Sequence, residues 1–125
     1  MKFQRRKINA SALSDYFVTP FVDYQIAHLD ALPPIAEAVG TRAEVLFDGG
    51  IRRGTDVVKA LALGARAVLI GRAQIYGLIV RGQQGVSDVL EILRSELDRA
   101  LMLMGVAGVR ELDRGWLIER DDAVI

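Results

Sequence analysis

The chain has 125 residues, of which 51% are hydrophobic and 26% charged, so it is long enough and apolar enough to build one folded domain. Its 16 basic and 16 acidic residues cancel to a formal net charge of zero, which argues against a nucleic-acid binder. With no cysteine and one histidine, the sequence excludes a disulfide framework, a thiolate metal site, a cysteine nucleophile and a histidine-rich metal site.

The N-terminal segment, residues 1–28, shows no clear periodicity, and we expect it to be divergent and weakly ordered. Met1–Ala10 is basic, but no apolar run of signal-peptide length follows it. No apolar run approaches the roughly 20 residues that span a bilayer. These features predict a cytoplasmic protein without a membrane span.

From Leu29 onward, apolar residues recur at spacings that alternate between those of helices and those of strands. The predicted elements, in chain order, are a helix over Leu32–Val39, a buried strand over Ala43–Asp48, a helix over Val57–Leu63 capped by Thr55-Asp56, a buried strand over Ala67–Ile70, a helix over Ala73–Val80, a long amphipathic helix over Val86–Met104 and a helical turn around Val109–Leu112. Strands that alternate with helices predict parallel βα units in residues 29–113. Residues 114–125 are interpreted as a C-terminal tail.

Glycine and arginine follow both predicted strands. Asp48, Gly49, Gly50 and Arg52 come after the first strand, and Gly71-Arg72 comes after the second. Successive parallel strands end at the same edge of a sheet, so these two loops should meet there. Glycine lets an anion approach the backbone N–H groups, and arginine is a forked donor that suits phosphate. The sequence therefore predicts a phosphate-binding site, which the helix beginning after Arg72 would strengthen.

Three stretches resemble the FMN-dependent α-hydroxy acid dehydrogenases, the family of flavin-type lactate dehydrogenase, lactate oxidase and glycolate oxidase. They are Asp-Gly-Gly-Ile-Arg-Arg-Gly-Thr-Asp-Val at 48–57, Lys-Ala-Leu-Ala-Leu-Gly-Ala at 59–65 and Ile-Gly-Arg at 70–72. The resemblance extends over about Leu29 to Leu112. It implies the C-terminal portion of a TIM barrel, with about two parallel strands that look like the seventh and eighth, and FMN as the cofactor.

The resemblance also implies roles for single residues. Asp48, Gly49, Gly50 and Arg52 would hold the FMN phosphate and ribityl region, and Gly71 and Arg72 would complete the phosphate site. Arg53 belongs to the matching motif but receives no separate role.

The resemblance further implies a catalytic histidine within a Ser-Asn-His-Gly-Gly-Arg-Gln segment, which should fall near residues 14–21. This chain instead has Ser-Asp-Tyr-Phe-Val-Thr-Pro-Phe there. His28 lies eleven positions after the expected base, and we assign it no catalytic role.

Family members are about three times longer than this chain. We therefore expect a fragment that retains the FMN phosphate loops, lacks independent dehydrogenase activity, and exposes apolar surface that leads to self-association or to pairing with a complementing barrel chain.

Two alternatives remain open from the sequence. An IMP dehydrogenase-like barrel shares the Asp-Gly-Gly strand end but has Gly-Ser where this chain has Gly71-Arg72. A non-catalytic structural remnant would bind no ligand at all.

Overall fold

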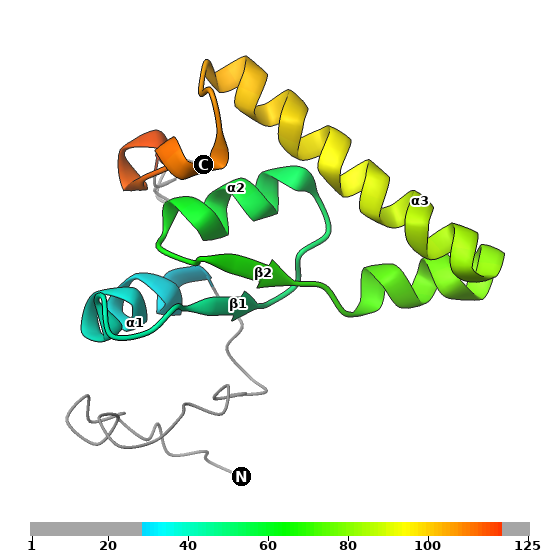
Figure 1. Cartoon of the computed structure of the whole chain (residues 1–125), viewed down its shortest axis with the longest axis horizontal. Coiled ribbons are helices and arrows are strands. Elements are labelled where there is room, and N and C mark those ends of the chain that lie inside the picture. The colour runs from blue at the N-terminus through cyan, green and yellow to red at the C-terminus, as the bar shows by residue number, and fades with distance from the viewer. Residues whose placement is uncertain (1–28, 119–125) are drawn as a thin grey trace, which may run out of the picture.

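The computed structural model describes residues 29–118, which form two short parallel strands and three α-helices with short 3-10 turns at either end (Figure 1). The elements in chain order are η2 (Leu29–Ala31), α1 (Leu32–Val39), β1 (Leu46–Asp48), α2 (Gly54–Ala62), β2 (Ala67–Leu69), α3 (Arg72–Met104), η3 (Val109–Glu111) and η4 (Arg114–Trp116). The predicted order of helices and strands is confirmed over this range. The segment expected to be weakly ordered, 1–28, lies outside the described residues.

The two strands are parallel neighbours, with Phe47 opposite Val68 and Asp48 opposite Leu69. Both are shorter than predicted, because the ladder covers only three residues of each apolar run. The prediction that both strands are buried is wrong for one face of the sheet. Phe47 is buried, whereas Leu46 and Leu69 are 56% and 46% exposed, because no described element covers the face on which they lie.

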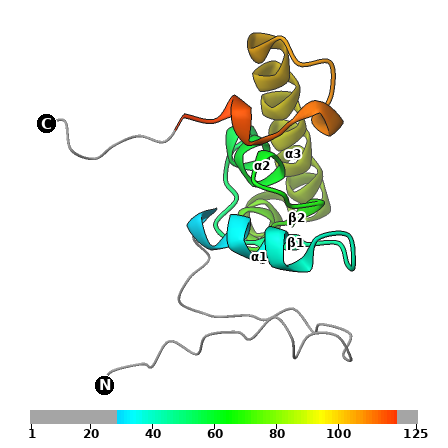
Figure 2. The same cartoon turned by 90° about the vertical axis from the view of Figure 1, so that its left-hand side faces the viewer.

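The core lies between the covered face of the sheet, α1 and α2. Helix α2 contacts both β2 and α3, and Figures 1 and 2 show it between the strands and the long part of α3. Leu32 of α1 and Val57 and Ala60 of α2 face this core, as the sequence pattern predicts, whereas Ile35, expected on the same face of α1, is 43% exposed. The buried members of the core are Leu32, Phe47, Ile51, Ala60 and Ala65.

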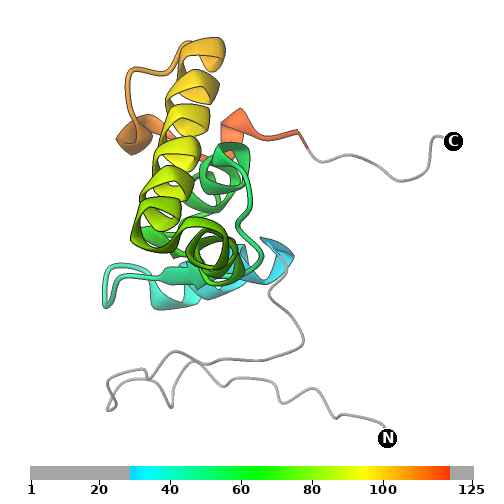
Figure 3. The same cartoon turned by 90° about the vertical axis from the view of Figure 1, so that its right-hand side faces the viewer.

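The prediction of two helices is confirmed in α3, which consists of two helical segments joined at a kink, although the break is shorter than the five residues predicted. Helix α3 runs from Arg72 to Met104, and only Arg81 and Gly82 depart from helical backbone angles. At Gly82 φ is +60°, which glycine adopts without the steric cost that other residues meet. The chain turns back there, as Figure 3 shows from the side. Gly77 and Gly85 then meet so closely that a Cβ on either would strike the backbone of the other.

Helix η4 occupies the start of the segment interpreted as a tail. Its first turn is closed by Asp113, whose Oδ1 accepts a hydrogen bond from Gly115 N at 2.8 Å. The indole N–H of Trp116 donates to the carbonyl oxygen of Glu111 at 3.2 Å. Within residues 29–118, no helix combines the length and the apolar character that crossing a membrane requires.

Candidate functional site

The two loops predicted to bind phosphate leave the sheet at the same edge. Asp48 and Leu69 are register partners at the last positions of their parallel strands. Gly50 and Gly71 each come two residues after the end of their strand. The parallel arrangement therefore places both glycines beyond the carboxyl edge of the sheet, on the side where Figure 1 shows the chain leaving both strands.

The shape of the loop after β1 is fixed by the backbone conformation of Gly50, the buried side chain of Ile51 and hydrogen bonds to Asp56. Gly50 has a φ of +62°, a left-handed conformation that favours glycine. Ile51 is buried in the core, so the loop is fixed at that point, while Arg52 beside it is exposed. Asp56 Oδ2 accepts hydrogen bonds from the backbone N–H groups of Arg52 at 3.1 Å and Arg53 at 3.0 Å.

The position of Asp56 corrects the predicted start of α2. The sequence suggested that Thr55 and Asp56 precede the helix as caps. The helix instead begins at Gly54, with Arg53 as its N-cap residue in an extended conformation. Asp56 therefore lies in the first turn, where its negative charge also interacts favourably with the helix dipole.

Glu96 joins this loop to α3. Its Oε2 accepts a hydrogen bond from Gly54 N at 2.8 Å, and its Oε1 accepts one from Arg53 Nη1 at 2.9 Å. The Gly54 bond, followed by the Arg53 bond, lowers the pKa of Glu96 below its ordinary value of 4.5. Gly54 is buried, and a Cβ there would lie 2.6 Å from Glu96 Cβ and collide with the backbone of Glu96 and Leu97. Only glycine permits this contact between α2 and α3.

The second loop presents the start of α3 at the same edge. Gly71 is the N-cap residue and Arg72 is the first residue of the helix, and both are exposed. The φ of Gly71 is −112°, an angle open to other residues, and a Cβ there would meet nothing within 4 Å. Packing within the described residues therefore does not require glycine at this position.

The arginines of the two loops differ in what they contact. Arg53 is committed to Glu96, whereas the guanidinium groups of Arg52 and Arg72 have no hydrogen-bond or ion-pair partner among residues 29–118. Both are exposed: Arg52 lies two residues after Gly50 in the loop after β1, and Arg72 follows Gly71 directly as the first residue of α3. The family resemblance gave a role to Arg52 and none to Arg53, and the structure adds a physical difference between them, because only Arg53 is held by a carboxylate.

FMN fits this edge of the sheet only if the residues there offer space, positive charge and N–H donors for its phosphate group. Gly71 leaves room where a side chain would stand, and two uncommitted guanidinium groups carry the charge that a phosphate attracts. The first N–H groups of α3 have no partner within the helix and are also donors to an anion. These residues fit a phosphate group.

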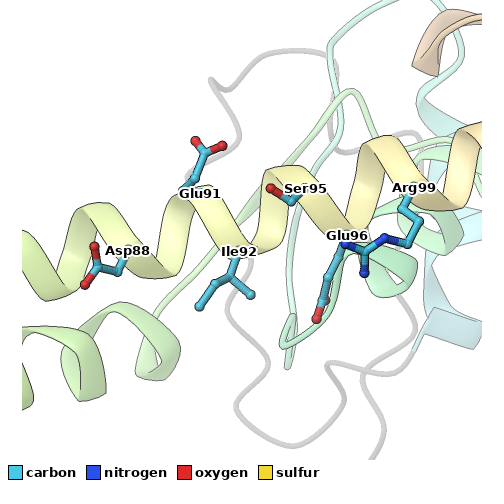
Figure 4. Close-up of a pocket in the computed structure, with 6 residues that line it drawn as sticks. All are labelled: Asp88, Glu91, Ile92, Ser95, Glu96 and Arg99. Carbon is cyan, nitrogen blue, oxygen red and sulfur yellow. The ribbon is translucent and has the colours of Figure 1, made fainter.

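The sequence gave Asp56 only a role as a helix cap and gave Glu96 no role. Asp56 gives a weak local signal, because a carboxylate three residues after an N-cap often bonds back to it. Glu96 gives none, since it lies 42 residues from the amide it binds. Glu96 also borders an open hollow of about 410 Å³ on α3 (Figure 4), where its side chain projects away from that of Glu91. All six residues that line this hollow belong to α3. Residues 29–118 contain no cluster of side chains able to hold a metal ion.

A comparison with protein families matches residues 21–119 to the FMN-dependent dehydrogenases. The chain belongs to this family. The family's cofactor is FMN, as the resemblance implied, and the match favours the flavin family over an IMP dehydrogenase-like barrel. Its range includes all six residues predicted to hold the cofactor.

Individual relatives agree with the family match. The chain is 55% identical over 96 residues to an L-lactate oxidase from Nostoc sp., which covers 77% of this chain and 26% of that protein. It is 62% identical over 86 residues to a pre-mycofactocin synthase from Mycolicibacterium smegmatis, covering 69% of this chain and 22% of the relative. The chain thus spans about a quarter of the length of the relatives it matches.

A solved structure of an (S)-mandelate dehydrogenase is similar to this chain, with a TM-score of 0.67 and 45% sequence identity. The match covers 74% of this chain and 26% of that enzyme. Such structural neighbours are TIM-barrel flavoenzymes. The two parallel strands and their helices are consistent with part of such a barrel.

Proposed function

We propose that this chain supplies the FMN phosphate-binding part of a flavin-dependent oxidoreductase acting on 2-hydroxy acids. The observation that carries the proposal is the pairing of glycine with an uncommitted arginine at two neighbouring strand ends: Gly50 with Arg52, and Gly71 with Arg72. The family match, and relatives described as 2-hydroxyacid and lactate oxidases, support the cofactor and the substrate class.

Each residue has a role that follows from its chemistry. The guanidinium groups of Arg52 and Arg72 neutralise the phosphate, and the backbone N–H groups of Gly49, Gly50 and Gly71 donate hydrogen bonds at close range. Asp48 is an acceptor, so it suits the ribityl hydroxyl groups rather than the phosphate. Bound FMN would supply hydride acceptance from the substrate.

Substrate oxidation also needs a base for the hydroxyl proton and a donor for the carboxylate. We propose that this chain contributes neither. Residues 14–21 lack the histidine segment that the family resemblance implies, and His28 is not offered as its replacement. Both positions lie outside the described residues. The expected property of the chain is therefore flavin binding without 2-hydroxy acid turnover.

A flavin titration of the full chain tests the proposal, with riboflavin as the matched ligand that lacks only the phosphate. We expect saturable FMN binding that is tighter than riboflavin binding. Arg52→Ala combined with Arg72→Ala should weaken FMN binding by about 100-fold or more, because two charge-assisted contacts are lost.

Arg42→Ala combined with Arg66→Ala is the control. These arginines lie near the amino ends of the strands, so the change removes the same charge away from the site. Absence of FMN binding by the folded chain, or equal weakening by both double variants, would overturn the proposal and favour a remnant that binds no ligand. Tighter binding of inosine monophosphate than of FMN would favour the purine-nucleotide alternative.

A further inference from the structure

Three successive backbone amides, at the end of the loop after β1 and the start of α2, are already used by carboxylates of the protein. Those of Arg52 and Arg53 donate to Asp56, and that of Gly54 donates to Glu96. Asp56 belongs to the helix that follows the loop, so its bonds are local. Glu96 lies on α3, so its bond fixes the loop relative to a different element. These amides are therefore unavailable to a phosphate, and they hold the loop in one shape before a ligand arrives.

Glu96 also determines which of two adjacent arginines is committed. Its second oxygen binds Arg53, whose backbone is extended at φ −130° and ψ 156°. Neighbouring side chains along extended backbone point to opposite sides. Holding Arg53 toward α3 therefore directs Arg52 away from it, and Arg52 is the one whose guanidinium has no partner among the described residues.

We propose that Glu96 is a positioning residue for the FMN phosphate, acting through Gly54 and Arg53 to hold the loop so that Arg52 can bind the anion. This inference rests on the proposed function. Its chemistry is preorganisation: a loop held in its binding shape loses less conformational freedom when the ligand binds. Glu96 itself carries a negative charge and does not contact the phosphate.

The decisive readout is the ratio of FMN to riboflavin affinity, because a general loss of structure would lower both affinities together. Glu96→Gln keeps a side-chain oxygen for Gly54 N but replaces the acceptor of Arg53 with an amide NH2 group. We expect FMN to bind about tenfold more weakly and riboflavin to bind as in the unmodified chain. The control is Glu91→Gln, which removes the same charge from the same helix on a side facing away from Glu96 (Figure 4) and should leave the ratio unchanged.

Arg53→Gln tests the same contact while keeping the Gly54–Glu96 hydrogen bond, so it serves if Glu96→Gln does not fold. It should also lower the ratio, whereas Arg99→Gln, which removes a positive charge elsewhere near Glu96, should not. The double variant Glu96→Gln with Arg53→Gln should have the same FMN affinity as the single variant with the lower affinity. The two changes remove one and the same contact, so their effects should not add.

The two proposals fail in different ways. If the unmodified chain binds FMN no better than riboflavin, the proposed phosphate site is wrong and the role of Glu96 is lost with it. If the unmodified chain prefers FMN but both Glu96→Gln and Arg53→Gln keep the full preference, the phosphate site stands and the positioning role of Glu96 is rejected.

Discussion

The backbone amide of Gly54 donates a hydrogen bond to Glu96 Oε2 at 2.8 Å, although 42 residues separate them in the sequence. This bond joins the start of α2 to the C-terminal half of the long helix α3, next to the loop that carries Arg52. The contact requires both partners, since Gly54 has no side chain to hold the helices apart and Glu96 satisfies a buried donor.

Replacing Gly54 should disrupt the contact between α2 and α3. A Cβ in Gly54→Ala would collide with the backbone of Glu96 and Leu97, which cannot move aside as a flexible side chain can. We expect a loss of about 1–3 kcal/mol or more in the free energy of unfolding, measured by urea denaturation.

Gly71→Ala is the matched control, because a Cβ there meets nothing within 4 Å and its φ is −112°. Its unfolding free energy should stay within about 0.5 kcal/mol of the unmodified chain. Equal stability of the two variants would contradict the close approach of α2 to α3.

Acid should weaken the contribution of Glu96 to stability. Its pKa in the folded chain is below the ordinary value of 4.5, so the ionised carboxylate stabilises the fold above that pH. The contribution is lost as the pH falls through the lowered pKa. Glu96→Gln lacks this group, so the difference in urea midpoint between the variant and the unmodified chain should be largest near neutral pH.

That difference should shrink as the pH is lowered below 4.5. Glu91→Gln, on the same helix, controls for the loss of one carboxylate. A difference in urea midpoint between Glu96→Gln and the unmodified chain that stays constant from neutral to acid pH would contradict a stabilising role for the ionised carboxylate of Glu96.

The turn within α3 depends on Gly82. Its φ of +60° and ψ of −141° are backbone angles that L side chains rarely adopt, although the space around a Cβ there is open. Gly82→Ala should therefore destabilise the chain by about 1–3 kcal/mol through backbone strain. Gly108→Ala is the control, since its φ of −175° is ordinary extended backbone and its surroundings are also open. Thermal unfolding of both variants provides the comparison.

The first segment of α3 carries an exposed apolar surface, which we expect to drive self-association. Ile79 and Val80 are 74% and 77% exposed. Sedimentation velocity over a concentration series should show association of the unmodified chain. The double variant Ile79→Lys, Val80→Glu should reduce it, and Glu91→Lys with Arg94→Glu should not. A chain that remains monomeric at every concentration would contradict this prediction. The residues of this surface are Ile75, Tyr76, Leu78, Ile79 and Val80.

The core packing of this small region should be sensitive to single methyl groups. Ile51 is buried beside the candidate site, at 5% exposure, whereas Ile79 is largely exposed. Ile51→Val should cost about 0.5–1.5 kcal/mol of unfolding free energy, and Ile79→Val should cost close to nothing. The unfolding free energies are measured by urea denaturation. A larger loss for Ile79→Val than for Ile51→Val would show that the core is assigned wrongly.

Periodicity and local motifs by themselves determined the order of helices and strands. The spacing of apolar residues predicted α1, α2 and both strands, and the glycines and arginines after the strands indicated a phosphate site. These features are local, because each depends on residues that lie close together in the sequence: the period of a helix or strand, or the loop at the end of a strand. The same locality explains the resemblance of residues 48–72 to a flavin family, which the comparisons confirm.

Only the tertiary structure decided which groups meet across long separations. Glu96 and Arg53 are far apart in the sequence, so no spacing rule connects them. Their ion pair is the reason that Arg53 binds a carboxylate of the protein while Arg52 is exposed without such a partner among the described residues. The exposure of Leu46 and Leu69 could not be predicted either, because an apolar strand is buried only on a face that another element covers. The sequence predicted a break between residues 80 and 86, but the close approach of Gly77 and Gly85 across the turn at Gly82 is known only from the structure.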